Sequence, residues 1–206
     1  LINIYDRLVN NLDKNFINGV VFADFKKTFD LVDHKVLIHK LHIYGLEGVA
    51  LQLITSYLTL RKQRTFINNV PSSSQYLTHG VPQGSVLAPI LFFKFINDLP
   101  VAISHPSIVD IFADDTTISN SAPWSDSQTL SDNLCRSTSN LEHWSENNHL
   151  QLNTDKTKSM LVTGKRLKAK FSLDELVLNI TTTNGVPLEQ VSCYKALGVI
   201  FDENLQ

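Results

Sequence analysis

Short apolar runs alternate along this chain with longer segments of helical periodicity, and this alternation restricts the possible folds more than any other feature. Apolar residues recur at helical spacing in residues 34–44, 46–60 and 127–147. Short apolar runs bounded by polar residues, Gly or Pro predict strands, which would span residues 19–23, 65–68, 108–113, 116–119 and 159–162. Strands separated by helices favour an α/β or α+β domain over a helical bundle or a β-sandwich.

Residues at the boundaries of these segments support the same reading. Asp33 can cap the helix at 34–44 with its carboxylate, and Gly45 is suited to end that helix. Residues 119–127 are expected to form a loop rather than a linker between domains. The 206 residues have room for one large domain or two small ones, and the sequence shows no internal repeat.

Composition excludes several classes of protein. Apolar residues make up 43% of the 206 residues and charged residues 18%, which excludes a disordered or collagen-like chain. Two cysteines are too few for a disulfide-built scaffold. No apolar run reaches the length of about 20 residues that a membrane-spanning helix needs, so no membrane partner is expected.

The charge of the chain is nearly balanced overall but uneven along the sequence. A formal net charge of −2 does not indicate a nucleic-acid-binding protein, which would have to concentrate its positive charge locally. Arg61, Lys62 and Arg64 form one basic cluster, and residues 156–170 contain six Lys or Arg and no acid. Each cluster is either a solvated surface or a contact for phosphates.

Acidic residues stand at the ends of two of the apolar runs. Residues 20–24 (Val-Val-Phe-Ala-Asp) form a buried-strand pattern that ends on Asp24. Residues 108–115 form another, which ends on Asp114 and Asp115; because a further apolar run follows at once, both would lie at the tip of a hairpin. Aspartate is also a common turn and capping residue, so each of the three could be purely structural.

Taken together, the three carboxylates suit a divalent metal. Adjacent carboxylates repel one another and raise one another's pKa unless a cation lies among them. Mg²⁺ prefers carboxylate oxygens and completes its coordination with waters and substrate phosphates. Two such ions about 4 Å apart can stabilise both oxygens of an in-line phosphoryl displacement. The pattern indicates nucleotidyl transfer or phosphodiester cleavage, and the spacing alone does not choose between them.

A glycine-bounded loop precedes an apolar helix in the middle of the chain. Residues 80–84 read Gly-Val-Pro-Gln-Gly, and the helix is expected from Ser85 onward. Glycines permit close backbone approach, and a helix N-terminus offers free N–H groups to a phosphate or a base. A plain loop before a core helix would show the same pattern.

Five motifs of the chain match one family in order. They occupy residues 22–34, residues 79–89 with 96–100, residues 112–116 (Phe-Ala-Asp-Asp-Thr), residues 150–158 and residues 194–199. On these motifs the chain resembles the reverse transcriptase domain of non-LTR (LINE-type) retrotransposons, in particular of the jockey and CR1 groups. The resemblance implies an α+β polymerase palm, a ferredoxin-like antiparallel sheet backed by helices. It also implies that residues 1–206 are the palm region of a longer polyprotein, whose fingers, thumb and endonuclease regions are largely missing from this sequence.

The resemblance assigns the metal ligands. Asp24, Asp114 and Asp115 would be catalytic and would bind two Mg²⁺ ions, with Mn²⁺ as an alternative. The backbone carbonyl of Phe25 would be a further ligand. A primer 3′-hydroxyl would attack the α-phosphate of the incoming deoxynucleotide, and the metals would hold both reacting oxygens.

The resemblance also assigns residues around the nucleotide. The ring of Phe29 would act as a steric gate that occupies the space of a ribose 2′-hydroxyl, which favours deoxynucleotides. Gln83 and Gly84 would contact the incoming nucleotide and the templating base. Lys156 would lie near the pyrophosphate and neutralise charge or donate a proton, with Lys158 as the less favoured choice.

The implied partners are an RNA template, a DNA primer and deoxynucleoside triphosphates. The residues expected to contact nucleic acid are Arg61, Lys62, Arg64 and Lys195. Three positions depart from the family pattern: Thr28 is usually Ala, Ala88 is usually Gly, and Ala196 is usually Tyr. The last departure removes an aromatic side chain from the hairpin that would hold the primer.

Two other functions stay open from the sequence. An RNase H-like nuclease would use Asp24 and Asp114 with a helical glutamate, Glu142 or Glu146, but it would not account for the Asp-Asp doublet or for residues 80–84. A noncatalytic or decayed nucleic-acid-binding remnant of a retrotransposon would bind in a salt-dependent manner and would need no metal.

Overall fold

The computed structural model describes residues 1–103, 106–173 and 176–205. The chain divides into two compact units, each built from discontinuous segments: residues 1–26, 99–146 and 151–206 form the first, and residues 27–98 and 147–150 form the second. The single domain expected over residues 1–206 stays a prediction.

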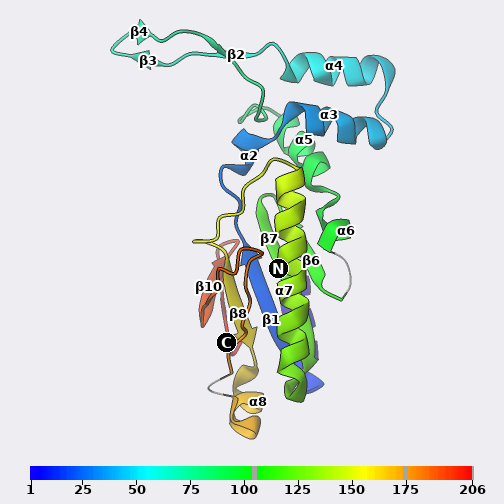
Figure 1. The fold of residues 1–206 in the computed structure, drawn as a ribbon, viewed down its shortest axis with the longest axis vertical. Helices are drawn as coiled ribbons and strands as arrows, with labels where there is room; N and C mark the ends of the chain where they lie inside the picture. Colours follow the sequence, from blue (N-terminus) through cyan, green and yellow to red (C-terminus); the bar gives the residue numbers. More distant parts are fainter. Residues whose placement is uncertain (104–105, 174–175, 206) are drawn as a thin grey trace. The chain divides into compact units, whose positions relative to one another are not determined.

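A five-stranded sheet forms the centre of the first unit (Figure 1). Its strands, in spatial order, are β6 (Ile108–Phe112), β7 (Asp115–Pro123), β1 (Phe16–Ala23), β8 (Lys158–Val162) and β9 (Glu189–Gln190). The β6–β7, β7–β1 and β1–β8 pairs are antiparallel, and only the short edge strand β9 runs parallel to its neighbour. The α+β class and the antiparallel sheet are therefore confirmed.

Strand β1 is buried on both faces, which explains its unbroken apolar sequence. Val20 and Phe22 point to one face, where they pack with Ile4 and Leu8 of α1 (Ile2–Asp13). Gly19 belongs to the opposite face, which is covered by α7 (Ser127–Asn147). Helices thus back the sheet from two sides and hold its central strand in place.

The close approach of α7 leaves little room for a side chain at position 19. A Cβ atom there would overlap Leu134 Cδ1 and would lie 3.1 Å from Leu178 Cδ1. We expect Gly19→Val to lower the free energy of unfolding by about 1–3 kcal/mol, because overpacking displaces core side chains. Urea denaturation measures the loss. Thr129→Val, at an exposed position of α7, is the control and should change the free energy by less than about 0.5 kcal/mol. Equal stability of the two variants would contradict this packing.

Further elements lie among the described residues of the first unit. They are α6 (Leu99–Ile103), a 3₁₀ turn (Trp124–Asp126), α8 (Gly164–Phe171), β10 (Cys193–Ala196) and β11 (Val199–Asp202). Strands β10 and β11 form an antiparallel hairpin. The hairpin packs through Ala196 and Phe201 onto the same apolar cluster as α1.

The second unit contains four helices and an exposed pair of short hairpins. The helices are α2 (Thr28–Leu31), α3 (His34–Ile43), α4 (Gly48–Leu58) and α5 (Leu87–Ile96). The hairpin strands are β2 (Lys62–Gln63), β3 (Phe66–Ile67), β4 (Val70–Pro71) and β5 (Gln75–Tyr76). Among the described residues of both units, no helix is long and apolar enough to cross a membrane.

Most expected elements are present, and one expectation is wrong. Asp33 caps α3 as predicted, since its carboxylate accepts hydrogen bonds from the backbone N–H groups of Lys35 at 2.7 Å and Val36 at 3.2 Å. Residues 119–127 are not a loop, because β7 continues to Pro123. The reason is its partner: β1 begins at Phe16, and the ladder between the two strands extends to the pair Phe16–Pro123.

Candidate active site

The register of the sheet brings Asp24 and Asp115 to the same end of neighbouring strands. Ala23 of β1 pairs with Thr116 of β7, so the next residues outward are Asp24 and Asp115. The hairpin that joins β6 to β7 closes at the pair Phe112–Asp115 and leaves Asp114 in its two-residue turn. The three predicted carboxylates therefore lie at one end of the sheet, with Asp114 at the hairpin tip as expected.

The electrostatics of this end reflect the closeness of the three acids. Burial raises the pKa of the Asp115 carboxyl, and the negative charges of Asp114 and Asp24 raise it further. Burial likewise raises the pKa of the Tyr194 phenol, with a further contribution from Asp115 and Asp24. Burial is the larger cause of both shifts, and the neighbouring carboxylates add a repulsion that a bound cation would relieve.

Tyr194 is a part of this site that sequence reasoning did not identify. It lies on β10, and its ring stacks on Phe22 with the centroids 4.0 Å apart and the planes 7° from parallel. Ala196, at the position where the family usually has Tyr, is instead buried in the apolar cluster beneath the hairpin. The hairpin thus keeps an aromatic residue beside the carboxylates, two positions earlier than expected.

The donor set fits a hard divalent cation that also needs ligands from outside the protein. Three carboxylates on adjoining strand ends offer oxygen ligands, but within residues 1–103, 106–173 and 176–205 no three His, Cys, Asp or Glu side chains form a ligand cluster by themselves. Mg²⁺ usually keeps several waters and takes substrate phosphate oxygens, so an incomplete protein cage is compatible with it. The Phe25 side chain is buried and contacts Trp144, so only its backbone could serve as a ligand.

Asn153 fixes the conformation of Asp24 and was not singled out from the sequence. Its side-chain Nδ2 donates to Asp24 Oδ2 at 3.0 Å, and its backbone N–H donates to the Asp24 carbonyl oxygen at 2.7 Å. The backbone N–H of Asp24 donates to Thr157 Oγ1 at 3.2 Å. The turn at residues 153–157 therefore holds Asp24 in place through hydrogen bonds to the Asp24 backbone and to the Asp24 carboxylate. The Asn-Thr-Asp sequence at residues 153–155 indicated a turn, but nothing local indicated its partner.

The same turn carries Lys156, and the contacts of the two lysines distinguish Lys156 from Lys158. Lys158 Nζ donates to Glu189 Oε2 at 2.6 Å and to the Asp155 carbonyl at 2.5 Å, so its charge is already paired. Lys156 is exposed. This difference favours Lys156 as the lysine that could meet a phosphate.

Other members of the basic run at residues 156–170 also have protein partners. Lys168 pairs with Glu203 at 2.9 Å, and Arg166 donates to the Leu12 carbonyl at 3.0 Å. These contacts tie α8 to the rest of the first unit. Much of this run therefore has a structural role. Lys195, by contrast, is exposed on β10 and points away from the cluster that buries Ala196.

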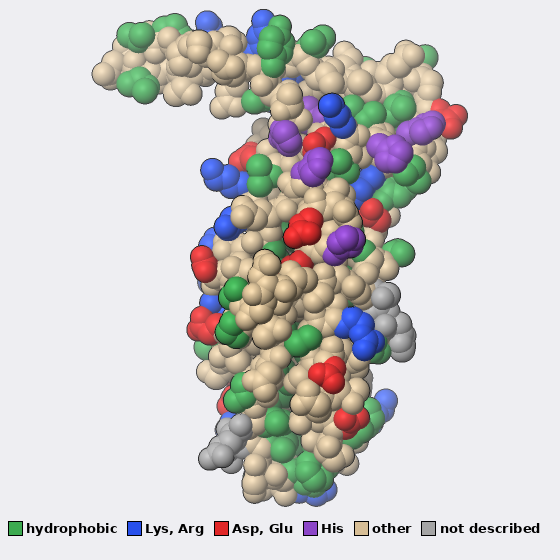
Figure 2. All heavy atoms as spheres, in the orientation of Figure 1, with side chains coloured by type: hydrophobic (Ala, Val, Ile, Leu, Met, Phe, Trp, Pro, Cys, Tyr) green, Lys and Arg blue, Asp and Glu red, His purple; other side chains and the backbone are tan. Residues whose placement is uncertain are grey.

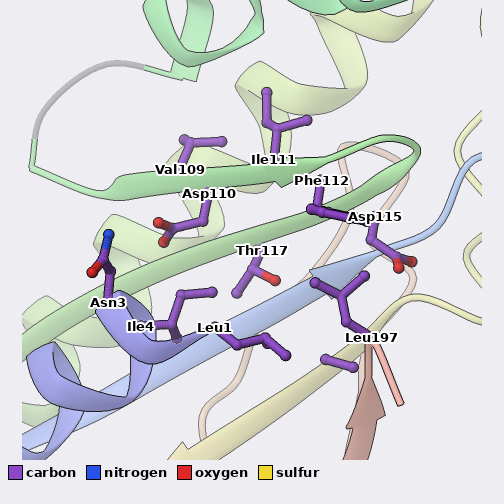
Figure 3. Close-up of a pocket in the computed structure, with 11 residues that line it drawn as sticks. Leu1, Asn3, Ile4, Val109, Asp110, Ile111, Phe112, Asp115, Thr117 and Leu197 are labelled. Atoms are coloured by element: carbon purple, nitrogen blue, oxygen red, sulfur yellow. The ribbon is translucent and has the colours of Figure 1, made fainter. Parts of the chain in front are cut away.

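A hollow lies beside Asp115 in the first unit (Figure 3). It is bounded by the start of α1, by β6 and β7, and by the turn between β10 and β11. Its other acid, Asp110, forms an ion pair with Arg7, whose Nη2 also donates to Ser119 Oγ at 3.2 Å. Asp110 thus has a cationic partner, whereas the pKa of Asp115 is raised by burial and further by the charges of Asp114 and Asp24.

The residues expected to contact the nucleotide come together in the second unit. One hollow is lined by Phe29, Gln83, Gly84, Ser85, Val86, Ala88 and Pro89. The Phe29 ring packs against Phe92, with the centroids 4.3 Å apart. Gln83 Nε2 donates to Asp30 Oδ1 at 2.9 Å. The structure therefore groups three of the predicted nucleotide-binding residues, and Phe25 and the carboxylates belong to the other unit.

The loop that carries Gln83 is anchored through a glycine. Gly80 has a φ of +84°, and a Cβ atom on it would lie 2.9 Å from the Asp30 carbonyl oxygen. Its N–H donates to the Val32 carbonyl at 2.8 Å, and the next N–H donates to the Phe29 carbonyl at 2.9 Å. The glycine is needed for this close approach, which places Gln83 next to the segment that bears Phe29.

Comparison with known proteins defines the class of the chain. The sequence profile of the reverse transcriptase (RNA-dependent DNA polymerase) family matches residues 5–201. The chain belongs to this family. The resemblance noted from the five motifs is thereby confirmed, and the RNase H-like alternative is left without support.

Individual relatives show which reverse transcriptases the chain is similar to. The chain is 30% identical to a probable RNA-directed DNA polymerase from transposon BS of Drosophila melanogaster, over 94% of the chain and 21% of the relative. It is 26% identical to the RNA-directed DNA polymerase from mobile element jockey of the same species, over 89% of the chain and 19% of the relative. The chain thus spans about a fifth of the length of these relatives.

Solved structures support the fold. Apo telomerase from Candida tropicalis matches all of the chain with a TM-score of 0.62 and 10% identity, and the chain covers 36% of that protein. A form of that telomerase truncated from its C-terminal domain gives a TM-score of 0.58 at 12% identity. At these identities the likeness concerns the fold alone, a palm-type polymerase domain.

Proposed function

We propose that this chain is the catalytic palm of an RNA-directed DNA polymerase of a non-LTR retrotransposon. The observation that carries the proposal is the grouping of Asp24, Asp114 and Asp115 at one end of the sheet of a reverse transcriptase-family chain. The raised pKa of Asp115 supports it, since the negative charges of Asp114 and Asp24 add to the effect of burial. The reaction would add deoxynucleotides to a primer 3′-hydroxyl under the direction of an RNA template.

The three carboxylates and the Phe25 carbonyl would hold two divalent cations, Mg²⁺ or Mn²⁺. When bound, such ions neutralise phosphate charge and favour deprotonation of the attacking hydroxyl. Asn153 would keep the Asp24 carboxylate in one orientation through the Nδ2–Oδ2 hydrogen bond. Lys156, exposed on the turn that holds Asp24 in place, would bind the pyrophosphate and give it a proton as it leaves.

The second unit would bind the base and the sugar of the nucleotide. Gln83 and Gly84 would contact the incoming nucleotide and the templating base from the wall of their hollow. Ala88 lines the same hollow. Phe29 would exclude a 2′-hydroxyl, since its ring is braced by Phe92 and cannot yield easily. Arg61, Lys62, Arg64 and Lys195 would contact the template and primer.

This function is tested by extension of a DNA primer annealed to an RNA template, in Mg²⁺ with deoxynucleotides. Extension that stops on chelation of the metal would support it. Salt-sensitive binding of the template without any extension would favour the noncatalytic remnant instead. A blunt RNA–DNA duplex, which offers no template beyond the primer, is the control.

Replacing Phe29 with alanine should relax the choice of sugar. The variant is expected to incorporate ribonucleotides at least tenfold more efficiently relative to deoxynucleotides, because the ring that clashes with the 2′-hydroxyl is gone. The ratio of kcat/KM values for the two nucleotides measures this effect. Phe93→Ala, on the exposed side of α5, is the matched control. An unchanged ratio in Phe29→Ala would show that this ring is not the gate.

A further inference from the structure

The second unit carries an exposed arm, residues 61–77, that has no core of its own. It consists of two stacked hairpins, β2 with β5 and β3 with β4, and is closed at its root by a hydrogen bond of 2.9 Å from the Leu77 N–H to the Arg61 carbonyl. Every residue from 62 to 76 is exposed. Its apolar side chains therefore contribute little to folding. Exposed apolar side chains grouped in this way indicate an interaction site.

The arm is positively charged and its cations have no acidic partners. Arg61, Lys62 and Arg64 lie on it, and residues 61–79 contain no Asp or Glu. None of the three forms an ion pair with a carboxylate of the described chain, in contrast to Lys158 and Lys168. The face of the arm visible in Figure 2 shows hydrophobic and basic side chains and no acidic one. A polyanion is the complementary ligand.

Two aromatic rings of the arm form cation–π contacts with two of these cations. Lys62 Nζ lies 4.5 Å from the centroid of the Tyr76 ring, and Arg64 Cζ lies 5.0 Å from that of Phe66. The two aromatic residues are 61% and 56% exposed. Exposed rings next to cations are what single-stranded nucleic acid binds, because unpaired bases stack on the rings while the cations contact phosphates. Paired bases in a duplex have no free face to offer.

The root of the arm opens into a polar hollow that adjoins the nucleotide hollow. Arg61, Gln63 and Leu77 line it from the arm, and His79 and Gln83 line it from the loop that follows. Asp30 also lines it, and its carboxylate accepts a hydrogen bond from Gln83. Gln83 is also a wall of the hollow that contains Phe29 and Gly84. The arm, the root hollow and the nucleotide hollow thus follow one another within the same unit.

We propose that the arm binds the unpaired RNA template ahead of the nucleotide site, with the first unpaired nucleotide in the root hollow. This proposal rests on the proposed polymerase function, and it adds a single-strand site that the catalytic residues do not require. The template would pass from Tyr76 and Phe66 to Arg61 and reach Gln83 as each base becomes the templating base.

Binding measurements without catalysis test the arm separately from the polymerase. Fluorescence anisotropy with a labelled single-stranded RNA of 12 nucleotides, in chelator, is compared with a blunt RNA duplex of 12 base pairs. We expect the single strand to bind at least fivefold more tightly. Lys62→Ala/Arg64→Ala should reduce the slope of log affinity against log salt by about 1.4, since each lost phosphate contact on a single strand contributes about 0.7.

The aromatic variant separates stacking from charge. Phe66→Ala/Tyr76→Ala should weaken binding of the single strand at least fivefold and leave the salt slope unchanged. Asn68→Ala/Ser73→Ala, also on the arm and exposed, should bind like the parent. Equal binding of the single strand and the duplex, or parental binding by both the charge and the aromatic variants, would overturn the proposal. The proposal would also be overturned if the arm bound a protein instead of RNA.

Templates with overhangs of different length distinguish failure of the proposal for the arm from failure of the proposed polymerase function. With a one-nucleotide overhang, the aromatic variant should extend a primer like the parent; with a ten-nucleotide overhang, its KM for template should rise at least fivefold at unchanged kcat. Absence of extension on both templates by the parent would contradict the polymerase, and the anisotropy result would still decide the arm. A parental KM on the long overhang would contradict the arm alone.

Discussion

Asp115→Asn is expected to lower the rate of primer extension at least 1000-fold. Asp115 lies beside Asp24 in the β1–β7 register and next to Asp114 in the hairpin turn, so its loss removes one of the three carboxylates that would hold the metals. Metal stabilisation of the transition state is worth several kcal/mol, and each 1.4 kcal/mol corresponds to about a factor of ten in rate. Single-turnover extension measures the loss. Asp132→Asn, an exposed acid of α7, should retain the parental rate.

The stability of the same variant shows that the loss does not come from unfolding. The folded-state pKa of Asp115 is raised by burial and by Asp114 and Asp24. An acid whose pKa is raised on folding destabilises the protein above its unfolded pKa, because the ionised form is disfavoured in the folded state. The Asp115→Asn variant, which is neutral at this position, should therefore be at least as stable as the parent at pH 7 in urea denaturation. Reduced stability together with reduced activity would contradict this account of Asp115.

Asn153→Ala is expected to weaken metal use without removing a metal ligand. The variant loses the Nδ2–Oδ2 hydrogen bond to Asp24 but keeps the backbone hydrogen bonds that hold the turn at residues 153–157. Groups that orient a ligand are typically worth about 10- to 100-fold in metal affinity or activity. We expect the Mg²⁺ concentration for half-maximal extension to rise by this factor, with a smaller change at saturating Mg²⁺.

A readout independent of catalysis completes this test. Mn²⁺ binding followed by electron paramagnetic resonance should weaken by a similar factor in Asn153→Ala. Thr154→Ala, the next residue of the turn, is the matched control and should bind Mn²⁺ like the parent. An unchanged Mn²⁺ affinity and Mg²⁺ dependence in Asn153→Ala would mean that Asn153 only holds the turn together.

The local sequence pattern was sufficient to predict the elements in which buried residues recur at one regular spacing. Helix α7 has the boundaries expected from its apolar spacing, residues 127–147, because one stripe of it faces the sheet along its full length. The capping of α3 by Asp33 depends only on neighbouring residues. The position of Asp24 beside Asp115 was partly predictable, since two apolar strands that each end on an acid bring those acids together when they pair.

Contacts between distant segments could not be predicted from local pattern. The extension of β7 to Pro123 depends on the length of β1. The hydrogen bonds between Asn153 and Asp24 join residues more than 120 positions apart, and the pairing of Phe25 with Leu152 helps to bring Asn153 there. Lys156 was already preferred over Lys158 from the resemblance, but the ion pair of Lys158 with Glu189 on the edge strand β9 could not be predicted. In each case the missing information was the partner and not the residue itself.

We propose that this chain copies RNA into DNA with Asp24, Asp114 and Asp115. The most direct measurement is single-nucleotide incorporation by the purified chain on RNA templates that differ only in the templating base, with Asp114→Asn in parallel. We predict that the parent adds only the complementary deoxynucleotide opposite each base in Mg²⁺, and that Asp114→Asn adds none. Equal incorporation by Asp114→Asn, or incorporation that ignores the templating base, would contradict the claim.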